Sequence, residues 1–288
     1  MADTDSTQQR IAAQTKAFKV AAIQMASGPN VEGNLSEARR LIEKAATQGA
    51  RLIVLPEYFP IMGMAETDKV GVREEQGSGP IQEFLSQMAR KHKVWLVGGS
   101  IPLSADDPAK VRNSCLVFDE TGERVARYDK IHLFNLELGN EHYHEARTIE
   151  PGNKVVVVDS PFGRIGLAVC YDLRFPELFR AMKDVNILVL PAAFTETTGK
   201  MHWEVLVRAR AIENLCYVVA SAQGGYHVNG RETYGHSMVV DPWGRVLDQL
   251  SRGSGVVLAE VNLSYQTSLR SSLPALSHRT IACTCCES

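Results

Sequence analysis

Three side chains that can take part in catalysis each lie at the end of a strand-like run of this sequence. Glu57 follows LIVLP, Lys130 ends RVARYDK, and Cys170 follows RIGLAV. In sheets whose strands alternate with helices, ligands bind where the strands end. A partly desolvated carboxylate can act as a base near neutral pH, a thiol can attack a carbonyl carbon, and an ammonium can stabilise an oxyanion. These residue types therefore suit nucleophilic catalysis by a thiol.

Each of the three also has an ordinary structural interpretation. Glu57 could point into water, Lys130 could be a surface lysine, and Cys170 could be a buried, inert thiol. The segment YDLRFPE after Cys170 indicates a turn that leads into a helix near Pro176, with Tyr171 or Asp172 at its start. Backbone N–H groups in such a turn can hold an oxyanion. The local pattern alone leaves both interpretations open.

Other catalytic motifs are weaker. The segment EHYHE, Glu141 to Glu145, has metal-binding residue types, but its spacing is not HExxH, which favours a polar loop over a metal site. Neither GxSxG nor GxxxxGKS occurs, so a serine-hydrolase elbow and a phosphate-binding loop are not indicated. The sequence predicts no metal and no cofactor.

Bulk composition narrows the class of protein. The chain has 288 residues, of which 44% are hydrophobic, and a formal net charge of −2. Without a long basic run, this charge indicates neither a nucleic-acid nor an anionic-membrane partner. No apolar run reaches the ~18 residues needed to cross a bilayer, and the N-terminus has no apolar signal region. We expect a cytoplasmic protein.

The elements that must position the three residues alternate between strands and helices, which predicts an α/β fold. LIVLPEYF (52–59) and ILVLPAAF (187–194) are similar, which suggests two halves of similar plan, each with its own sheet. The expected strands are 18–25, 51–57, 94–100, 185–194, 216–223 and 255–263, the helices are 34–50, 80–93, 177–184 and 201–215, and the hairpins are 112–130, 154–170 and 236–250.

The expected helix 201–215 carries an apolar stripe of Val205, Ala209 and Ile212. Apolar residues at this spacing share one face of a helix. We interpret the stripe as core or as a subunit interface, rather than as a cofactor site.

Taken together, LPEYF, YDKIHLF and VCYDLRFPEL have the order and spacing of a known family. From about Phe18 to Arg279 the chain resembles the nitrilase superfamily of carbon–nitrogen hydrolases. FTETTGKMHWEVLVRARAIEN and YGHSMVVDPWG are similar to the Nit branch, which holds deaminated glutathione amidases and ω-amidases, and look closer to the first group. Glu145 matches the second glutamate of the family.

The resemblance implies a four-layer αββα sandwich and subunits that pair into homodimers or larger homo-oligomers. It places a carbon–nitrogen hydrolase domain at residues 18–279. Residues 1–17 then form a flexible N-terminal extension. Residues 280–288 form a tail with Cys283, Cys285 and Cys286, which we interpret as flexible rather than as a thiol metal clip.

The resemblance also implies a mechanism without metal or cofactor. Glu57 takes the proton of Cys170, and the thiolate attacks the amide carbon. Lys130 and the backbone N–H of Tyr171 hold the oxyanion, while Glu145 holds Lys130 and the substrate amide. Glu57 protonates the leaving ammonia, and water activated by Glu57 then hydrolyses the thioester.

A small carboxylate-bearing amide is the expected substrate, with deaminated glutathione first. Arg174 is a candidate carboxylate clamp, although an ion pair with Glu177 on the same turn fits it equally well. Loop position and family likeness add Tyr58, Phe194, Thr198 and His202 as pocket walls. The alternatives are an ω-amidase acting on α-ketoglutaramate-like amides, a nitrilase or carbamoylase, and a catalytically silent binding or scaffold protein.

Overall fold

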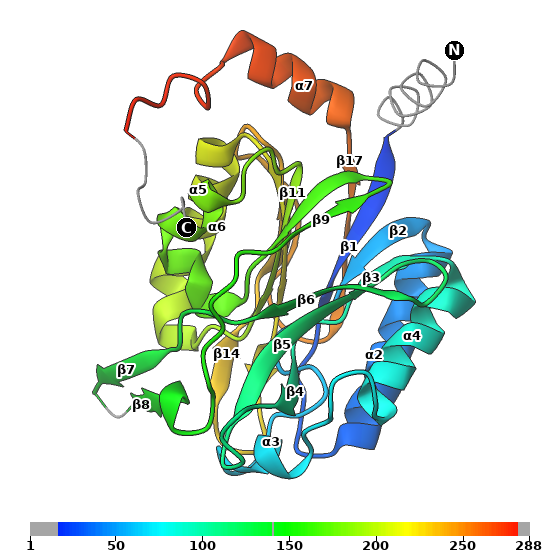
Figure 1. Cartoon of the computed structure of the whole chain (residues 1–288), viewed down its shortest axis with the longest axis vertical. Coiled ribbons are helices and arrows are strands. Elements are labelled where there is room, and N and C mark those ends of the chain that lie inside the picture. The colour runs from blue at the N-terminus through cyan, green and yellow to red at the C-terminus, as the bar shows by residue number, and fades with distance from the viewer. Residues whose placement is uncertain (1–16, 140, 282–288) are drawn as a thin grey trace.

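A computed structural model describes residues 17–139 and 141–281 of the chain, and two large sheets form its centre (Figure 1). The N-terminal residues 1–16 and the cysteine-rich end, 282–288, lie outside the described residues. The first sheet has the order β17 (Gly255–Val261), β1 (Phe18–Gln24), β2 (Ala50–Val54), β3 (Trp95–Val97), β5 (Val111–Phe118), β4 (Ile101–Ser104), with β6 (Arg124–Asp129) also paired to β5. The second has the order β16 (Val246–Leu250), β15 (Ser237–Val240), β12 (Tyr217–Ala222), β11 (Ile187–Ala192), β10 (Gly163–Leu167), β9 (Val157–Ser160).

Both sheets have the same plan. Strands β1, β2 and β3 run parallel in the first sheet, as do β10, β11 and β12 in the second, and antiparallel strands flank each trio. The similar segments 52–59 and 187–194 begin in the central strands β2 and β11. The expected pair of similar halves is therefore confirmed, as are the three expected hairpins.

The remaining elements are short hairpins and helices. The hairpins are β7 (Asn135–Leu138) with β8 (Glu141–His144) and β13 (Gly224–Tyr226) with β14 (Glu232–Tyr234). The α-helices are α2 (Val31–Thr47), α3 (Asp68–Gly71), α4 (Pro80–His92), α5 (Pro176–Ala181), α6 (Glu196–Asn214) and α7 (Leu263–Ser272), and the 3-10 helices are η1 (Glu145–Arg147) and η2 (Cys170–Arg174).

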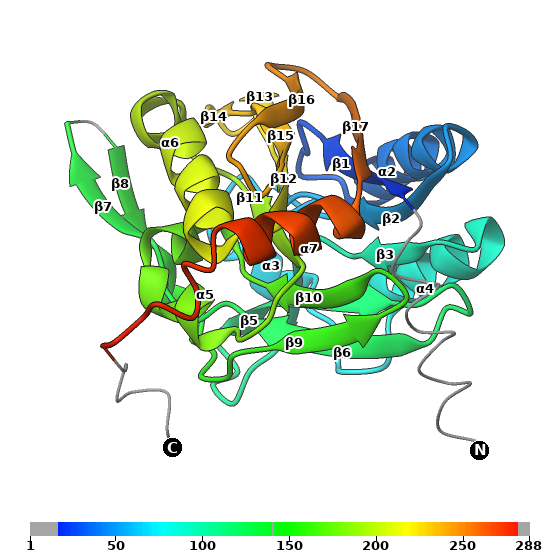
Figure 2. The ribbon, with the colours of Figure 1, turned by 90° about the horizontal axis from the view of Figure 1, so that it is seen from above.

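Strand alternation explains how the layers stack. In β1, Val20 and Ala22 join the apolar core between the sheets, whereas Ala21 and Ile23 pack with α2 and α4. Figure 2 shows the sheets end-on, with α2 and α4 outside one and α5 and α6 outside the other. The four-layer αββα sandwich expected from the sequence is confirmed. No described helix has both the length and the apolar character to cross a membrane.

Helix starts differ from the expected ones because capping residues set them. Helix α2 begins at Val31, where the Asn30 side chain accepts a hydrogen bond from Gly33 N (2.8 Å). Helix α6 begins at Glu196 rather than 201, since the Thr195 side chain accepts one from Thr198 N (3.2 Å). Strand β4 was not expected.

The apolar stripe of α6 does not belong to the core of this subunit. Val205 is 67% exposed and Ile212 is 48% exposed, while Trp203 and Val207 on another face are fully buried. The core interpretation of the stripe is therefore wrong, because its residues point outward from the outer helical layer. The subunit-interface interpretation stays a prediction.

Candidate active site

The structure brings Glu57, Lys130 and Glu145 into one buried ion-pair network. The Lys130 ammonium donates to Glu57 Oε1 at 2.9 Å and to the two Glu145 oxygens at 2.9 and 2.8 Å. The side chains of Lys130 and Glu57 are at most 1% exposed, and that of Glu145 is 12% exposed. Burial of ionised groups is costly unless they are paired and hydrogen-bonded, as these are.

Glu57 is held at the end of β2 by its neighbours in β3 and β5. Asn113 Nδ2 of β5 donates to Glu57 Oε1 at 3.0 Å. After β3, Gly99 adopts φ +57°, and a Cβ added there would lie 2.1 Å from the Pro56 carbonyl oxygen. Only glycine fits this approach, so the loop after β3 can lie directly against the turn that carries Glu57.

Glu145 is fixed by hydrogen bonds from two further segments of the chain. Its carboxylate accepts hydrogen bonds from Tyr58 OH (2.7 Å) and Phe134 N (2.7 Å), besides those of Lys130. Tyr58, expected as a pocket wall, therefore positions Glu145 through its hydroxyl. Tyr58 also adopts φ +56°, a left-handed conformation that is uncommon for a bulky residue and found at functional sites.

The segment EHYHE is a hairpin strand followed by η1, not a polar loop. His142 and His144 both lie beside Glu137 of the facing strand β7, whereas Glu145 turns inward to Lys130. The described residues hold no group of three or more His, Cys, Asp or Glu side chains placed to bind a metal ion.

Cys170 stands at a strained turn after β10. It opens η2 with φ +51°, although Val169 before it is extended, and its side chain is nearly buried. Asp172 Oδ2 accepts a hydrogen bond from Val169 N at 2.9 Å and so closes the turn. Backbone strain of this kind persists only where the surroundings over-determine it.

Asp172 also joins this turn to the strand end that carries Lys130. Its buried carboxylate accepts hydrogen bonds from Tyr128 OH (2.6 Å) and His132 N (3.0 Å), and His132 Nδ1 lies 2.7 Å away. Tyr128 and His132 flank Lys130 in the sequence. Asp172 therefore fixes the position of Cys170 relative to Lys130.

Burial and the neighbouring charges set the protonation of these groups. Burial raises the pKa of the Glu57 carboxyl, and the Lys130 charge opposes the shift only partly. Burial and the charge of Glu57 raise the pKa of the Cys170 thiol well above its usual range. Although burial opposes it, the two carboxylates raise the pKa of Lys130, so the ammonium keeps its proton. At rest, a neutral thiol lies beside a carboxyl group that can take its proton.

A pocket opens over Cys170 between the two sheets' strand ends and the start of α6. Arg174 lies over the rings of Tyr171 (5.6 Å) and Phe194 (5.4 Å). Its Nη1 hydrogen-bonds to His202 Nδ1 at 3.2 Å, and no ion pair with Glu177 occurs within the described residues. The lining residues are Phe134, Cys170, Tyr171, Arg174, Ala193, Phe194, Thr195 and Thr198.

His202 is exposed and does not line this pocket, so its contact is with Arg174 rather than with the cavity. Thr195 and Thr198, by contrast, place the N-terminus of the 19-residue helix α6 at the pocket wall. Free backbone N–H groups and the helix dipole favour an anion at such a position. Arg174 and the α6 start thus provide two independent attractions for a carboxylate.

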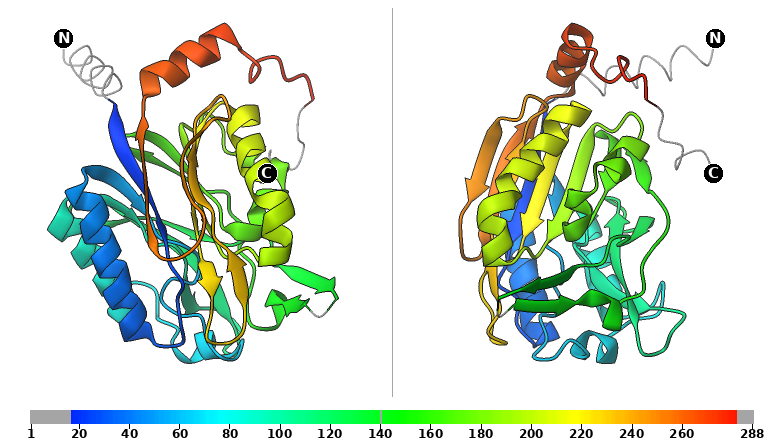
Figure 3. Two further views of the ribbon diagram at one scale, coloured as in Figure 1. Left: turned by 180° about the vertical axis from the view of Figure 1, so that it is seen from behind. Right: turned by 90° about the vertical axis from the view of Figure 1, so that its left-hand side faces the viewer.

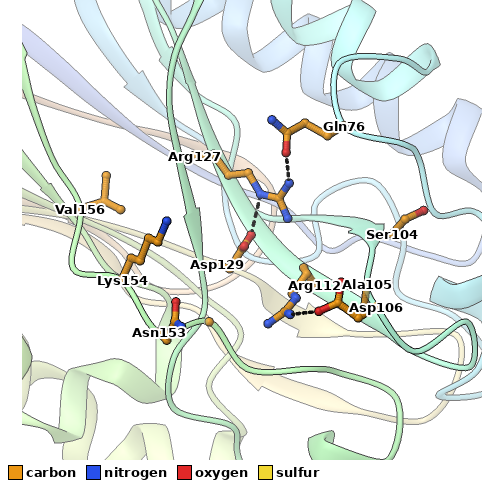
Figure 4. A pocket seen from close by; sticks show the side chains of 11 residues that line it. Gln76, Ser104, Ala105, Asp106, Arg112, Arg127, Asp129, Asn153, Lys154 and Val156 are labelled. Carbon is orange, nitrogen blue, oxygen red and sulfur yellow. Dashed lines mark hydrogen bonds and ion pairs between the residues drawn. The ribbon is translucent and has the colours of Figure 1, made fainter.

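A more open hollow of about 470 Å³ lies apart from this site, around β5, β6 and residues 152–156 (Figure 4). Its arginines are already paired, because Arg127 bonds to Asp129 (2.9 Å) and Gln76, and Arg112 bonds to Asp106 (3.2 Å). Asp129 precedes Lys130, but its side chain turns into this hollow, whereas that of Lys130 turns to Glu57. The residues that line the hollow include no cysteine, and its carboxylates, Asp106 and Asp129, are paired with the arginines.

Sequence reasoning missed three residues that build the site, namely Asn113, Tyr128 and Phe134, and it placed Asp172 only as a turn residue. Asn113 and Tyr128 act through hydrogen bonds to partners that lie more than 40 positions away, and Phe134 N donates to Glu145. The available signal was the polar run Arg112–Ser114 at the start of a strand whose remaining residues are apolar.

Comparison with known proteins agrees with this geometry. Residues 19–271 match the carbon–nitrogen hydrolase family. The deaminated glutathione amidase of Yersinia enterocolitica is 40% identical over 268 residues, covering 91% of this chain and 93% of that protein. The human protein of the same name is 41% identical over 267 residues, covering 90% and 81%.

Among solved structures, Saccharomyces cerevisiae Nit3, described as a member of branch 10 of the nitrilase superfamily, matches with a TM-score of 0.83. It is 32% identical, and the match covers 93% of this chain and 98% of Nit3. Likeness of this extent, together with a thiol, a carboxylate and an ammonium in one buried site, argues against a silent binding protein. The chain belongs to the carbon–nitrogen hydrolase family of the nitrilase superfamily and is a hydrolase of C–N bonds.

Proposed function

We propose that this chain is an amidase in which Cys170 is the nucleophile and Glu57 the general base. The observation that supports this best is the Lys130 ammonium, which is hydrogen-bonded to Glu57 and Glu145 within the site that holds the thiol. Because the pKa of Cys170 is raised by burial, the thiol needs an adjacent base before it can attack. Glu57 is that base.

The reaction proceeds through a thioester. Glu57 takes the thiol proton as sulfur bonds to the amide carbon, and the carbonyl oxygen becomes an oxyanion. The C–N bond then breaks, and the proton held by Glu57 passes to the leaving nitrogen. Glu57 next removes a proton from water, which attacks the thioester carbon and releases the acid and the Cys170 thiol.

Lys130 and the backbone N–H of Tyr171 are the proposed oxyanion donors. Lys130 is pre-positioned because Glu145 holds its ammonium through both carboxylate oxygens, and Tyr58 and Phe134 hold Glu145. A fixed donor of this type is typically worth about 3 kcal/mol in the transition state. Glu145 thus acts as a positioning residue for Lys130.

Deaminated glutathione is the proposed substrate, since the relatives reported above bear that name. It consists of an α-keto acid joined by an amide bond to a cysteine–glycine dipeptide. Arg174 and the α6 N-terminus would bind the keto-acid carboxylate, with Phe194 and Thr198 as pocket walls. Attack by Cys170 on the amide carbon then releases the dipeptide as the leaving amine.

The leaving group distinguishes this substrate from that of an ω-amidase. Deaminated glutathione contains no primary amide, so its cleavage yields an amine rather than ammonia. The family resemblance implied the release of ammonia. That outcome applies to primary amides such as α-ketoglutaramate. A carboxylate bound at Arg174 suits both substrates.

A substrate panel tests the proposal. Deaminated glutathione, α-ketoglutaramate, an aliphatic amide and a nitrile would each be incubated with the protein, and the acid product, the released amine and ammonia would be quantified by mass spectrometry. We expect the highest kcat/KM for deaminated glutathione and a covalent thioester on Cys170. A higher value for α-ketoglutaramate would assign an ω-amidase, and no turnover of any compound would overturn the amidase.

We also propose that the protein forms a homo-oligomer through the outer face of α6. Met201 and Val205 are 69% and 67% exposed, and Trp243 of the β15–β16 turn is 58% exposed. Arg208 Nε donates to Gly244 O at 2.8 Å, which brings that turn against the helix. Such an apolar patch on an outer layer is typical of a subunit interface.

A further inference from the structure

A small positively charged hollow of about 20 Å³ lies beside the catalytic network. Arg231, from the loop between β13 and β14, and Lys69, from α3, line it together with Tyr58 and Glu66. Tyr58 also forms part of the catalytic site, because its hydroxyl binds Glu145. The two cations and one carboxylate leave the hollow with a net positive charge.

The guanidinium of Arg231 lacks a close oxygen acceptor within the described residues. Its Nη1 lies 3.7 Å from Glu66 and 3.7 Å from the Met62 sulfur, and its Nε is buried without a hydrogen-bond partner. Glu66 is already bound by Lys69 at 2.5 Å. Buried polar groups are normally paired, so an unpaired arginine nitrogen beside a hollow indicates a missing acceptor.

The hollow adjoins the pocket over Cys170. Tyr58 and Met62 pack with Ala193 in one apolar cluster, and Ala193 lines the Cys170 pocket. Strand β14, which follows Arg231, is tied to the same wall, because Tyr234 N donates to Phe194 O at 3.0 Å.

A row of aromatic rings connects the two arginines. Arg174 lies over Tyr171 at 5.6 Å, and the Tyr171 ring meets Phe134 at 5.1 Å. Phe134 meets Tyr143 at 5.4 Å, and Arg231 lies over Tyr143 at 4.9 Å. Tyr143 belongs to the β7–β8 hairpin, which projects from the body of the molecule in Figure 3. An elongated ligand along this row would meet an arginine at each end.

We propose that Arg231, assisted by Lys69, forms a second subsite that binds a carboxylate on the amine half of the substrate. The inference rests on the proposed amidase function and sharpens it, because it names the substrate class: amides with an acidic group on both sides of the cleaved bond. The planar guanidinium suits bidentate carboxylate binding. Deaminated glutathione, whose dipeptide half ends in a glycine carboxylate, meets this requirement.

Binding to a protein that cannot turn over isolates the subsite from the chemistry. Full-length Cys170→Ala and Cys170→Ala/Arg231→Gln would be titrated calorimetrically with deaminated glutathione and with its C-terminal amide, which lacks the distal charge. Arg231 should give the acid an advantage of about 10- to 100-fold over the amide, as expected for a hydrogen-bonded ion pair. The Arg231→Gln change should abolish this advantage and leave binding of the amide within about twofold.

Arg90→Gln is the matched control, since it removes the same charge from an exposed position in the last turn of α4, away from the site and from the α6 face. Thermal melting would establish that each variant is folded. Equal affinity for acid and amide in Cys170→Ala would overturn the subsite, as would no binding of either ligand. Equal losses in the Arg231 and Arg90 variants would overturn it too.

Hydrolysis by the unaltered protein reports on the proposed function separately. A chain that prefers the acid through Arg231 but does not cleave it refutes the amidase assignment and not the subsite. A chain that cleaves acid and amide with equal kcat/KM, with or without Arg231, refutes the subsite and not the amidase.

Discussion

At the level of single residues, one buried ammonium faces two carboxylates. Lys130 compensates the charges of Glu57 and Glu145 together, so the trio carries a net charge of −1 when all three groups are ionised. Removal of a carboxylate and removal of the ammonium therefore have opposite electrostatic consequences. Catalysis needs the carboxylate of Glu57 and the ammonium of Lys130, whereas the free energy of unfolding should fall only when the ammonium is removed.

Glu57→Gln should abolish most activity without loss of stability. The variant keeps a hydrogen-bond acceptor for Lys130 and Asn113, removes one buried charge, and lowers kcat/KM about 10²- to 10⁴-fold as expected for a lost general base.

Lys130→Met leaves two buried carboxylates facing each other and should cost about 3–5 kcal/mol of unfolding free energy. Urea denaturation of both variants checks this, and equal destabilisation would contradict it.

The acidic side of the pH profile should follow Glu57. The base must be ionised to accept the thiol proton, and burial raises its pKa above the ordinary 4.5. We expect kcat/KM to fall as the pH drops through this raised pKa. Rates measured from pH 4 to 9 test this, and a limb at or below pH 4.5 would exclude Glu57 as the base.

The same shifts predict how stability changes with pH. The raised pKa of Glu57 means that its contribution to stability is present below pH 4.5 and is lost as pH rises through the folded-state pKa. Burial opposes ionisation of Glu145, but Lys130 lowers its pKa, so its contribution is present above pH 4.5 and is lost as pH falls through the folded value. As the pH rises through the folded-state pKa of Glu57, the carboxylate that catalysis needs is formed, and the same ionisation lowers the free energy of unfolding.

At the level of elements, the strands and hairpins were predictable, whereas the start of α6 was not. The apolar runs before Glu57 and Cys170 predicted β2 and β10, since continuous apolar segments are typical of buried strands. The first turn of α6 was missed because Gly199 is a poor helix former. Tyr234 explains its presence: a Cβ at position 199 would lie 2.3 Å from the Tyr234 Cβ. The close approach of α6 to β14 therefore requires glycine at position 199, although glycine is unfavourable in a helix.

Asp172 shows why part of the site was beyond sequence reasoning. The sequence placed Asp172 at the start of a turn, and its hydrogen bond to Val169 N agrees with that role. Its bonds to Tyr128 and His132 join residues that lie 40 or more positions apart. These hydrogen bonds depend on how η2 packs against the end of β6. A local sequence pattern cannot predict that packing.

Asp172→Asn should impair the nucleophile without touching the substrate. An amide replaces one acceptor oxygen with a donor, so it cannot accept from Val169 N, Tyr128 OH and His132 N together. We expect a loss of about 2–3 kcal/mol of stability and a fall in kcat larger than any change in KM. Asp159→Asn, at the exposed position of β9, is the control. An unchanged kcat would contradict the positioning role.

At the level of the whole molecule, the site lies where two similar halves meet. The first half supplies Glu57 from the loop after β2, and the second supplies Ala193 and Phe194 from the equivalent loop after β11. The likeness of segments 52–59 and 187–194 indicated the two halves, and loop position with family likeness placed Phe194 at the pocket wall. The Arg231 subsite was not predicted, because it is built from the irregular loops that the α/β pattern leaves unspecified.

The outer face of α6 carries the last prediction, on assembly. A single subunit has a mass of 31.7 kDa, and the exposed Val205 lies near the middle of the proposed interface. A charge buried there would be unpaired in the assembly but solvated in the monomer, so Val205→Glu should favour monomers. Light scattering should give a multiple of 31.7 kDa for the unaltered protein and a value close to 31.7 kDa for the variant.

Val125→Glu places the same charge on the partly exposed strand β6, away from α6, and should keep the mass of the unaltered protein. If both variants remain assembled, the α6 face is not the interface; if the unaltered protein is monomeric, the oligomer proposal fails outright. Because α6 also places Thr195 and Thr198 at the pocket, loss of assembly should raise KM for the carboxylate substrate more than it lowers kcat. Kinetics measured on the monomeric variant therefore show whether subunit pairing supports the carboxylate-binding end of the site.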